Sequence, residues 1–564
     1  MAFKLAPFSK AVYDVKFKPD RPPETHARRY FIALAVAIAF LTLIARLFQL
    51  TIVKGAYYRY LAENNRLREY ALDGPRGVIF DRKGIVLARS GSERDKDGNV
   101  RRYYTQGPAL AHVIGYRQKA SKNSLKHDAC PHPLKSNDKI GAKGVEYVFE
   151  CHLRPTKGMK LVETNAQGKE IRAISQVEPK PGNDLKLSID SELQTKTLEA
   201  IQGDTIKSPT LTTYSDRKIA VVALKPQTGE VLELFSYPTY DPQDFEDGSA
   251  TVTSYLTAPD KPLFDRALLG TYPPGSVFKP IVAVGALETG AITEDETIVD
   301  NGFLKAGPLT FNNWYYAQYG RTEGAVDLRK AIRRSNDIYF YTIGAKLTPK
   351  GIQDWAHKFG LGRKSGIQLD DAIGHIPTEF WKKEVLGERW YLGDTYNLSI
   401  GQGYMLVTPL QIAQETSVIA NQGKLCRPTI LKIGAAENKE IDGSDRSRCL
   451  DLHISKETVT AVREGMHQAC LSGGTGWPFF DFRAGPVDSS ATTSSKPRIE
   501  VGCKTGTAES QSKDHAPHAW FTVFAPFENP EIVLTVLVEN SGEGSNVAAP
   551  LAKEILRQYF ERAD

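Results

Sequence analysis

One long apolar run, from Phe31 to Val53, most constrains how this chain can fold. The polar residues that interrupt it are Thr42, Arg46, Gln49 and Thr51. About twenty apolar residues suffice to cross the hydrocarbon core of a bilayer, whereas a cleaved signal peptide has a shorter apolar core followed by a small-residue cleavage site. The run therefore predicts a single transmembrane anchor over residues 30–53.

The flanks of the run predict its orientation. Lys54-Gly-Ala-Tyr-Tyr-Arg59, which follows it, has the aromatic and basic character of a membrane interface. Lysine and arginine accumulate on the cytoplasmic side of membranes. The basic residues before the run are Lys4, Lys10, Lys16, Lys18, Arg21, Arg28 and Arg29. We expect residues 1–29 to be a cytoplasmic tail, with membrane lipid around the anchor of a single-pass protein of the cytoplasmic (inner) membrane. Nearly all of the remaining chain is expected to be extracytoplasmic, or periplasmic.

Composition narrows the classes of partner. A length of 564 residues predicts two or three domains. The formal charge is only +6 and there is no dense basic run, which argues against nucleic acid as a partner. No Cys-x-x-Cys or His-x-x-x-His pair suggests a metal, so neither a metal site nor a cofactor is expected.

The six cysteines allow two interpretations. Cys130 with Cys151, and Cys426 with Cys449, could each close a loop in an oxidising compartment, which leaves Cys470 and Cys503 over. Small buried thiols are an equally weighted alternative. Spacing alone does not fix the pairing.

Hydrophobic patterning predicts an α+β fold. After a helix over residues 57–72, a β-rich segment ends in the turn Asp81-Arg-Lys-Gly84, and residues 89–145 read as strands and loops. The elements expected further on are a strand near 181–190, a helix over 193–201, a hairpin of 219–224 with 231–235, strands over 519–525 and 532–539, and a helix over 548–560. Strands early and late around a largely helical middle predict one sheet that joins both ends of this segment.

Ser276-Val-Phe-Lys279, directly after Pro273-Pro-Gly275, is the main candidate for chemistry. Positions i and i+3 lie on one face of a helix, so a hydroxyl and an amine come within reach of each other, as a serine nucleophile and its base require. The same spacing occurs at Ser136 with Lys139, Ser215 with Lys218 and Ser510 with Lys513, so the pattern alone is weak.

Two downstream motifs strengthen that candidate: Ser335-Asn-Asp337 and Lys504-Thr-Gly-Thr507. Ser-x-x-Lys, Ser-Asp-Asn and Lys-Thr-Gly together form the signature of penicillin-binding proteins and class A β-lactamases. A second match to the last motif, Lys364-Ser-Gly366, lies in a glycine-rich turn with no strand after it, so Lys504 is preferred.

Further segments share this resemblance, which runs from about Leu61 to Lys553. They are the segment that begins Leu61-Ala-Glu-Asn-Asn, Pro75 to Gly84, Gly393 to Gly403, Val407 to Ala413, His518 to Phe521 and Val538 to Ser541. The chain resembles the class B penicillin-binding proteins, and more narrowly their elongation-type members, penicillin-binding protein 2. The resemblance implies a β-rich pedestal or dimerisation-type domain over 54–200. It also implies a transpeptidase domain over 201–564, with an antiparallel sheet flanked by helices as in serine β-lactamases.

The resemblance also implies a role for each motif residue. Ser276 would attack D-Ala-D-Ala stem peptides of nascent peptidoglycan to form an acyl-enzyme, with Lys279 as base and Ser335 as proton relay. Lys504, Thr505, Gly506 and Thr507 would hold the donor's carboxylate. Backbone N–H groups of Ser276 and Thr507 would form the oxyanion hole. β-Lactams would acylate the same serine, and a D,D-carboxypeptidase side activity would be possible.

The acidic Asp337 raises a question of charge. Lys279 can act as a base only when neutral, and a nearby cation such as Lys504 would lower its pKa. An ionised Asp337 beside Lys279 would instead favour the charged lysine. We therefore expect Asp337 to pair mainly with another cation or to accept hydrogen bonds.

Other functions compete with cell-wall cross-linking during elongation and shape maintenance. A division-specific homologue is disfavoured by Asp337 and by Ile338-Tyr-Phe-Tyr341, which resemble elongation-type members. A non-catalytic penicillin-binding scaffold or sensor would need a signalling domain, and a secreted β-lactamase would lack the anchor. No glycosyltransferase domain precedes the transpeptidase segment, so a separate membrane glycosyltransferase of the elongation machinery is an expected partner.

Overall fold

A computed structural model describes residues 26–165, 167–203, 205–439, 441, 449–486, 496–510 and 515–562. The basic residues of the tail from Lys4 to Arg21, and Lys513 of one Ser-x-x-Lys match, lie outside these ranges. The chain divides into two compact units, one comprising residues 1–71 with 159–177 and the other residues 72–158 with 178–564.

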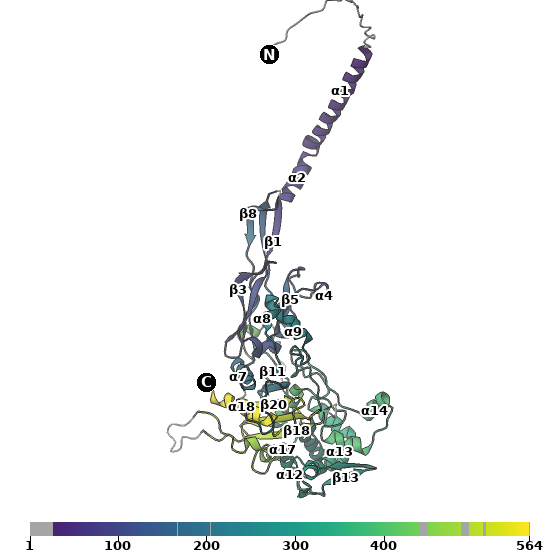
Figure 1. Ribbon diagram of the computed structural model, residues 1–564, viewed down its shortest axis with the longest axis vertical. Coiled ribbons are helices and arrows are strands. Elements are labelled where there is room, and N and C mark those ends of the chain that lie inside the picture. Colours follow the sequence, from purple (N-terminus) through teal and green to yellow (C-terminus); the bar gives the residue numbers. More distant parts are fainter. Residues whose placement is uncertain are drawn as a thin grey trace, which may run out of the picture. The chain divides into compact units, whose positions relative to one another are not determined.

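The first unit contains the apolar run as a long helix (Figure 1). Helix α1, His26–Phe48, continues through a π-helical turn, η1, Gln49–Val53, into α2, Gly55–Arg66. The part Ala27–Val53 has a mean hydropathy of 2.5, and within the described ranges it is the one helix long and apolar enough to cross a membrane. Its large apolar side chains are exposed, which suits a segment surrounded by lipid. The structure is thus consistent with a single N-terminal anchor.

A three-stranded sheet completes the first unit. Strand β7, Gly158–Thr164, lies between β1, Leu67–Leu72, and β8, Glu170–Val177. The helix predicted over residues 57–72 is therefore wrong beyond Arg66, where strand β1 begins directly. Pairing with a segment far along the chain outweighs local helical preference here, and the sequence around residue 66 carries no sign of that partner.

In the second unit, residues 72–158 form a small module of strands and short helices. Its main sheet has the order β4-β3-β2-β9, with β2 Ile79–Phe80, β3 Val86–Arg94, β4 Val100–Tyr104 and β9 Leu185–Lys186. The predicted turn after β2 is present, and the Asp81 carboxylate accepts hydrogen bonds from the Lys83 and Ile85 N–H groups, both at 2.8 Å. The other elements are η2 Gly107–Leu110, α3 Ala111–Ile114, β5 Arg117–Lys119, α4 Lys122–Lys126, β6 Lys139–Gly141, α5 Gly144–Val148 and α6 Glu150–Leu153.

A five-stranded antiparallel sheet organises the rest of this unit, in the order β11-β10-β20-β19-β18. Its strands are β10 Ile219–Leu224, β11 Val231–Tyr237, β18 Gly502–Ala508, β19 His518–Ala525 and β20 Ile532–Val538. Because β10 pairs with β20, the early hairpin and the late strands form one sheet, as predicted. Strand β18, which carries Lys504, is at one edge of this sheet.

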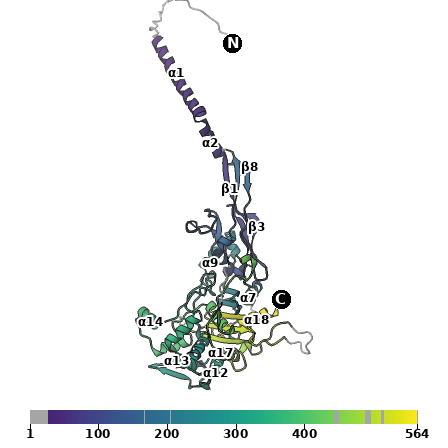
Figure 2. The ribbon, with the colours of Figure 1, turned by 180° about the vertical axis from the view of Figure 1, so that it is seen from behind.

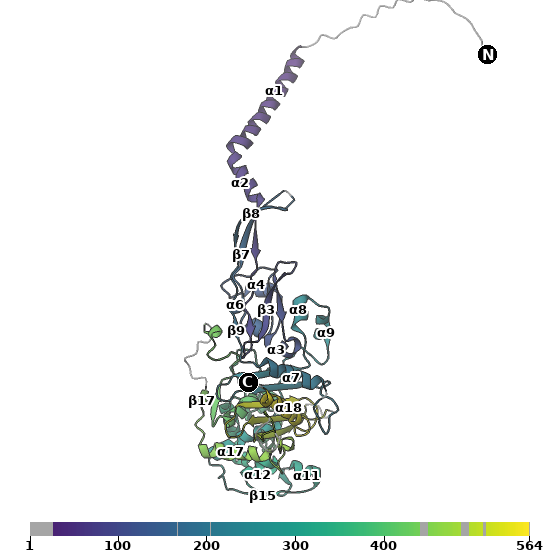
Figure 3. The ribbon, with the colours of Figure 1, turned by 90° about the vertical axis from the view of Figure 1, so that its left-hand side faces the viewer.

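Helices cover both faces of the sheet. Ile219, Val221 and Ala223 of β10 belong to the same buried cluster as side chains of α7, Ser191–Gln202, and α18, Ala548–Glu561. Ala220 and Val222 instead join the cluster that contains α16, Pro409–Ala420, and α10, Lys279–Glu288. Figure 3 shows α7 and α18 on one side of the strands, and α12 and α17 on the other; Figure 2 gives the same order from behind. This arrangement confirms the predicted α+β class.

The helical middle lies between β11 and β18 in sequence. Its longer elements are α8 Pro242–Asp247, α9 Thr251–Thr257, α11 Trp314–Tyr319, α12 Leu328–Arg334, α13 Asp337–Lys358, α14 Glu379–Leu386, α15 Leu392–Ser399 and α17 Lys456–Ala469. Short strand pairs join β12 Ile298–Asp300 with β15 Gly324–Val326, β13 Phe303–Ala306 with β14 Leu309–Asn312, and β16 Lys424–Cys426 with β17 Cys449–Asp451. Single-turn 3-10 helices are η3 Gly275–Phe278, η4 Ala436–Asn438 and η5 Trp477–Phe479.

All six cysteines are paired in the structure. The disulfides join Cys130 to Cys151, Cys426 to Cys449, and Cys470 to Cys503. The first two pairs are those that spacing suggested, and the two cysteines left over also pair with each other. The buried-thiol alternative is therefore wrong for this structure.

Candidate active site

Ser276 lies in a single 3-10 turn, η3, that leads directly into α10. Residues i and i+3 eclipse in a 3-10 helix, so Ser276 and Lys279 lie on one side of the turn. Pro273 and Pro274 restrict the approach to the turn, and the Pro273 carbonyl accepts a hydrogen bond of 2.9 Å from the Trp520 indole. The Gly275 N–H donates to the Gly401 carbonyl at 2.8 Å. Two further segments of the family resemblance thus hold the turn of the candidate nucleophile.

Gly275 brings this turn against strand β18. Its φ is +57°, in the left-handed region that L side chains rarely adopt, and a Cβ there would be 2.9 Å from the Thr507 carbonyl oxygen. Gly506 of the strand is equally restricted, because its Cβ would be 3.0 Å from Val277. Glycine at both positions lets the serine turn and the edge strand approach closely.

Lys279 has a fully buried side chain whose amine binds the second motif. Its Nζ donates to the Ser335 carbonyl oxygen at 2.8 Å, to Ser335 Oγ at 3.3 Å and to Asp337 Oδ1 at 2.7 Å. These acceptors match the three donors of an ammonium group. Burial lowers the pKa of Lys279, and the charge of Asp337 opposes that effect.

Asp337 therefore does not behave as predicted. It was expected to pair mainly with another cation, but its ion pair is with Lys279 itself. Its second oxygen, Oδ2, accepts a hydrogen bond from the Trp314 N–H at 2.9 Å. The expected hydrogen bonding is therefore present, but within the described ranges the expected pairing with another cation is not. The physical reason is the burial of the Lys279 amine: a carboxylate beside a buried ammonium offsets its desolvation. The sequence does not reveal how deeply that amine is buried.

Lys504 lies on the other side of Ser335 and is also fully buried. Its Nζ donates to Ser335 Oγ at 2.8 Å and to the Thr505 carbonyl oxygen at 3.0 Å. Burial, followed by the charge of Lys279, lowers the pKa of Lys504 well below its ordinary value. In the structure, a neighbouring cation therefore lowers the pKa of Lys504, whereas the sequence predicted this effect on the pKa of Lys279.

Ser335 connects the two lysines. Its oxygen accepts from both amines, which uses both lone pairs and leaves its own proton free to be donated. Its φ of +54° is left-handed, a conformation that costs a non-glycine residue of order 1–3 kcal/mol and persists only where the surroundings enforce it. The hydroxyl is thus placed to exchange protons with either amine.

A cleft of about 540 Å³ beside strand β18 is lined by residues of all three motifs. The predicted residues that line it are Ser276, Ser335, Asp337, Thr505 and Thr507. Because β18 is an edge strand, backbone groups on its outer side are not used by a neighbouring strand. The structure thus brings the three motifs together, although each lies on a different element.

Several residues of the cleft were not singled out from the sequence. The Thr475 hydroxyl accepts a hydrogen bond from the Thr505 hydroxyl at 2.8 Å, and Gln402 donates to the Thr507 carbonyl at 3.3 Å. Gln402 belongs to the Gly393–Gly403 segment and could have been found there. Thr475, in a glycine-rich loop, carried no such signal. Trp314 also lines the cleft.

Two of the other sequence matches lie away from the cleft. Lys139, of the match at Ser136, forms ion pairs with Asp95 and Glu246. Lys364, of the second Lys-Ser-Gly match, lies in a loop and forms an ion pair with Asp370 at 2.9 Å. Within the described ranges, no group of three or more histidine, cysteine or acidic side chains could hold a metal ion.

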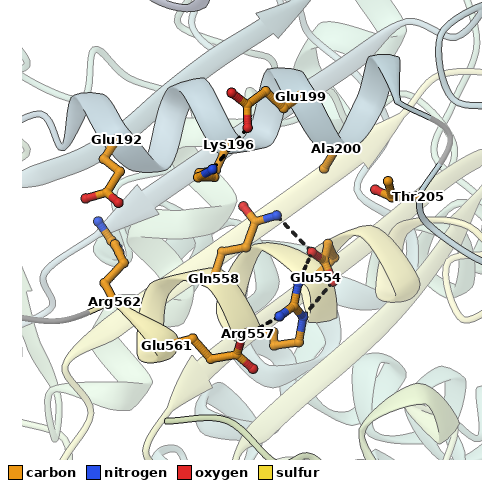
Figure 4. Close-up of a pocket in the computed structure, with 10 residues that line it drawn as sticks. All are labelled: Glu192, Lys196, Glu199, Ala200, Thr205, Glu554, Arg557, Gln558, Glu561 and Arg562. Carbon is orange, nitrogen blue, oxygen red and sulfur yellow. Dashed lines mark hydrogen bonds and ion pairs between the residues drawn. The ribbon is translucent and has the colours of Figure 1, made fainter. Parts of the chain in front are cut away.

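A second hollow of about 550 Å³ lies between α7 and α18 (Figure 4). It is lined by Glu192, Lys196, Glu199, Ala200, Thr205, Glu554, Arg557, Gln558, Glu561 and Arg562. Its charges are largely paired: Arg557 with Glu554 at 2.5 Å, and Lys196 with Glu199 at 3.2 Å. None of the predicted motif residues reaches it, and we place no active site there.

The geometry places a serine, two buried lysines and a bridging hydroxyl beside an edge strand, an arrangement that suits a serine acyltransferase. The chain belongs to the penicillin-binding protein transpeptidase family. The family described as "Penicillin binding protein transpeptidase domain" matches residues 219–557, and "Penicillin-binding Protein dimerisation domain" matches residues 96–187.

Curated relatives share most of the chain. "Peptidoglycan D,D-transpeptidase MrdA" of Haemophilus influenzae is 33% identical over 474 residues, which cover 82% of this chain and 70% of the relative. The protein of the same name from Escherichia coli K12 is 28% identical and covers 94% of this chain and 93% of its own length.

Solved structures of related proteins are similar to this chain over most of its length. Pseudomonas aeruginosa PBP2 in complex with WCK 5153 has a TM-score of 0.71 at 32% identity, covering 87% of this chain and 96% of that one. Helicobacter pylori PBP2 in complex with MreC has a TM-score of 0.70 at 26% identity, covering 87% and 98%. A chain from a peptidoglycan synthase complex has a TM-score of 0.70 at 26% identity, covering 94% and 98%.

Proposed function

We propose that this protein is an elongation-type peptidoglycan D,D-transpeptidase that cross-links stem peptides through an acyl-enzyme at Ser276. The observation that carries the proposal is one cleft at the open edge of β18, lined by Ser276 and by Ser335, whose hydroxyl binds both buried lysines. The relatives named MrdA support the reaction class.

The donor peptide ends in a carboxylate, and the groups that bind this carboxylate determine the position of the donor in the cleft. Lys504 and the hydroxyls of Thr505 and Thr507 bind this carboxylate, and backbone atoms around Gly506 line the strand beside it. A bound anion favours the charged form of Lys504. The proton reaches Lys504 through Ser335, which gives its own proton to Lys504 and takes one from Lys279.

That transfer leaves Lys279 neutral and able to act as the base. Ser276 Oγ attacks the carbonyl carbon of the penultimate D-alanine, and its proton passes to Lys279. The N–H groups of Ser276 and Thr507 stabilise the negative oxygen of the tetrahedral intermediate. The C–N bond then breaks, and the departing D-alanine amine takes its proton through Ser335. An ester remains on Ser276.

Cross-linking reverses these proton movements. The amine of a second stem peptide attacks the ester carbonyl and loses a proton through Ser335. An amide bond forms, the C–O bond to Ser276 breaks, and the serine hydroxyl regains its proton from Lys279. Water in place of the amine would give the D,D-carboxypeptidase side reaction, and a β-lactam would acylate Ser276 by the first half of the sequence.

The part of the donor that precedes its terminal dipeptide lies toward Glu509. Another hollow, of about 710 Å³, shares Asn312, Ile400, Gln402 and Glu509 with the active cleft. The carboxylate-binding Thr505 is at the other end of the cleft, beside Thr475. An extended donor that passes Ser276 along β18 therefore continues into this 710 Å³ hollow, where Phe311, Tyr404 and Trp381 offer aromatic walls.

Location and partners follow from the same proposal. Residues 1–29 form a cytoplasmic tail, 30–53 the anchor, 54–200 the pedestal and 201–564 the extracytoplasmic transpeptidase domain. The three disulfides suit an oxidising compartment. A separate membrane glycosyltransferase supplies the glycan strands, an assignment supported by the relative solved within a peptidoglycan synthase complex.

Labelling with a fluorescent penicillin tests the nucleophile. Wild type and Ser136→Ala, a control in which an accidental Ser-x-x-Lys match is removed, should both label, and Ser276→Ala should not. An unlabelled folded wild type, or a labelled Ser276→Ala variant, would contradict the assignment. Detection of cross-linked stem dimers with a membrane glycosyltransferase distinguishes the enzyme from a non-catalytic scaffold.

A further inference from the structure

Asp300 is a buried carboxylate outside the three motifs. It ends strand β12 and is 2% exposed. Its Oδ2 accepts hydrogen bonds from Asn313 Nδ2 and Asn336 Nδ2, both at 2.8 Å, and from the Glu323 N–H at 3.1 Å. Its Oδ1 accepts from the Gly302 N–H at 2.7 Å. No salt bridge to Asp300 occurs within the described ranges, so these hydrogen bonds are what compensates its burial.

The two asparagines carry this network into the active site. Asn336 lies between Ser335 and Asp337, and its Oδ1 caps helix α13 by accepting from the Tyr339 N–H at 2.9 Å. The Oδ1 of Asn313 accepts from the Asp337 N–H at 3.1 Å. Both asparagines are fully buried. One carboxylate thus anchors the backbone on both sides of the Asn336–Asp337 peptide bond.

An ionised carboxylate fixes the direction of this network because it only accepts hydrogen bonds. With both amide NH₂ groups directed at Asp300, each amide oxygen must face the motif, where it accepts an N–H. An asparagine at position 300 would keep one acceptor oxygen and direct its own NH₂ at a neighbouring donor. The left-handed Ser335 needs such enforcement, since its conformation is intrinsically unfavourable.

We propose that Asp300 is a positioning residue for acylation, acting through Asn313 and Asn336 to hold Ser335 and Asp337 against the Lys279 amine. This role rests on the proposed function of the cleft. Asp300 itself does not line the cleft and touches no reacting atom. Its substitution should therefore slow the chemical step rather than weaken initial binding.

The test compares Asp300→Asn with Asp81→Asn by stopped-flow acylation with a fluorescent penicillin. Asp81 is a matched control because it is fully buried, accepts three hydrogen bonds and lies in the β2–β3 turn. Asp300→Asn should lower the acylation rate constant about tenfold or more, while the dissociation constant of the initial complex changes less than about threefold. Asp81→Asn should leave both unchanged, and thermal unfolding measures the stability of each variant.

A double-mutant cycle separates positioning from general destabilisation. Once Asp300 is replaced, Asn336→Ala should slow acylation by no more than about twofold further, because both changes interrupt one network. Unchanged acylation in folded Asp300→Asn, or additive losses in the cycle, would overturn the role. If Asp300→Asn does not fold, Asn313→Ala takes its place with the same expectations. A wild type that fails to acylate refutes the proposed function, whereas a fully active Asp300→Asn refutes only this role.

Discussion

Gly275→Ala should both destabilise the protein and slow its acylation, for separable reasons. The left-handed φ of +57° costs an alanine about 1–2 kcal/mol. The added Cβ would also lie 2.9 Å from the Thr507 carbonyl oxygen and 3.3 Å from the Ala508 Cβ. These neighbours belong to a strand that cannot rotate away, so η3 and β18 must separate. We expect a total loss of about 2–3 kcal/mol in the free energy of unfolding.

The separation should affect catalysis because the proposed oxyanion hole has one N–H on each side of this contact. Removal of one oxyanion donor costs a factor of about 10²–10³ in rate, so acylation should fall about a hundredfold. Gly387→Ala is the matched control: its φ is +71°, and nothing lies within 4 Å of the new Cβ. It should lose only the conformational part, about 1–2 kcal/mol of stability, and no activity.

Denaturant unfolding and stopped-flow acylation by a fluorescent penicillin measure the two effects separately. Equal destabilisation of both variants, combined with acylation of Gly275→Ala at the wild-type rate, would refute the reasoning. It would mean that the close approach of η3 to β18 is not what the oxyanion hole requires.

Three further predictions concern charge and covalent structure. Asp337→Asn removes the charge that opposes the burial-lowered pKa of Lys279, so the acid limb of the acylation rate should move to lower pH; an unmoved limb would contradict Lys279 as base. Burial raises the pKa of Glu233 to about 8, so its contribution to stability is complete below pH 4.5 and is lost as the pH rises toward 8. Glu233→Gln should therefore be more stable than wild type by roughly 5 kcal/mol at pH 9, and equally stable at pH 4, in denaturant titrations. Replacing Cys470 and Cys503 together by alanine should lower the free energy of unfolding by about 2–4 kcal/mol, and an unchanged melting temperature would argue against that disulfide.

The sequence predicted the sheet well because its signals are local. The 219–224 and 231–235 runs are continuous β-rich segments around a turn, and they form β10 and β11. The helix predicted through Leu72 ends at Arg66 because β1 pairs with β7. The strand predicted near 181–190 is only Leu185–Lys186 for a similar reason, since its extent depends on the neighbouring β2.

For the site, motif spacing identified which residues meet but not how they are charged. Ser276 and Ser335 line one cleft, and the Lys504 amine binds the Ser335 hydroxyl. The pairing of Asp337 with Lys279, and the stronger lowering of the pKa at Lys504, depend on burial, which spacing does not report. Asp300 gave no signal, because a lone aspartate at the end of a short strand has no characteristic pattern until its two asparagines are seen around it.

The position of β10 between β11 and β20 also determines when this protein can finish folding. The β10–β11 hairpin is synthesised early, but the edge of β10 stays unpaired until β20, which lies far along the chain, has been made. Such non-local pairing is slow, and until it forms the unpaired edge of β10 is exposed to non-native strand pairing. A chain that ends before Ile532 lacks β20 and cannot join β10 to β19, although it retains Ser276 and both buried lysines.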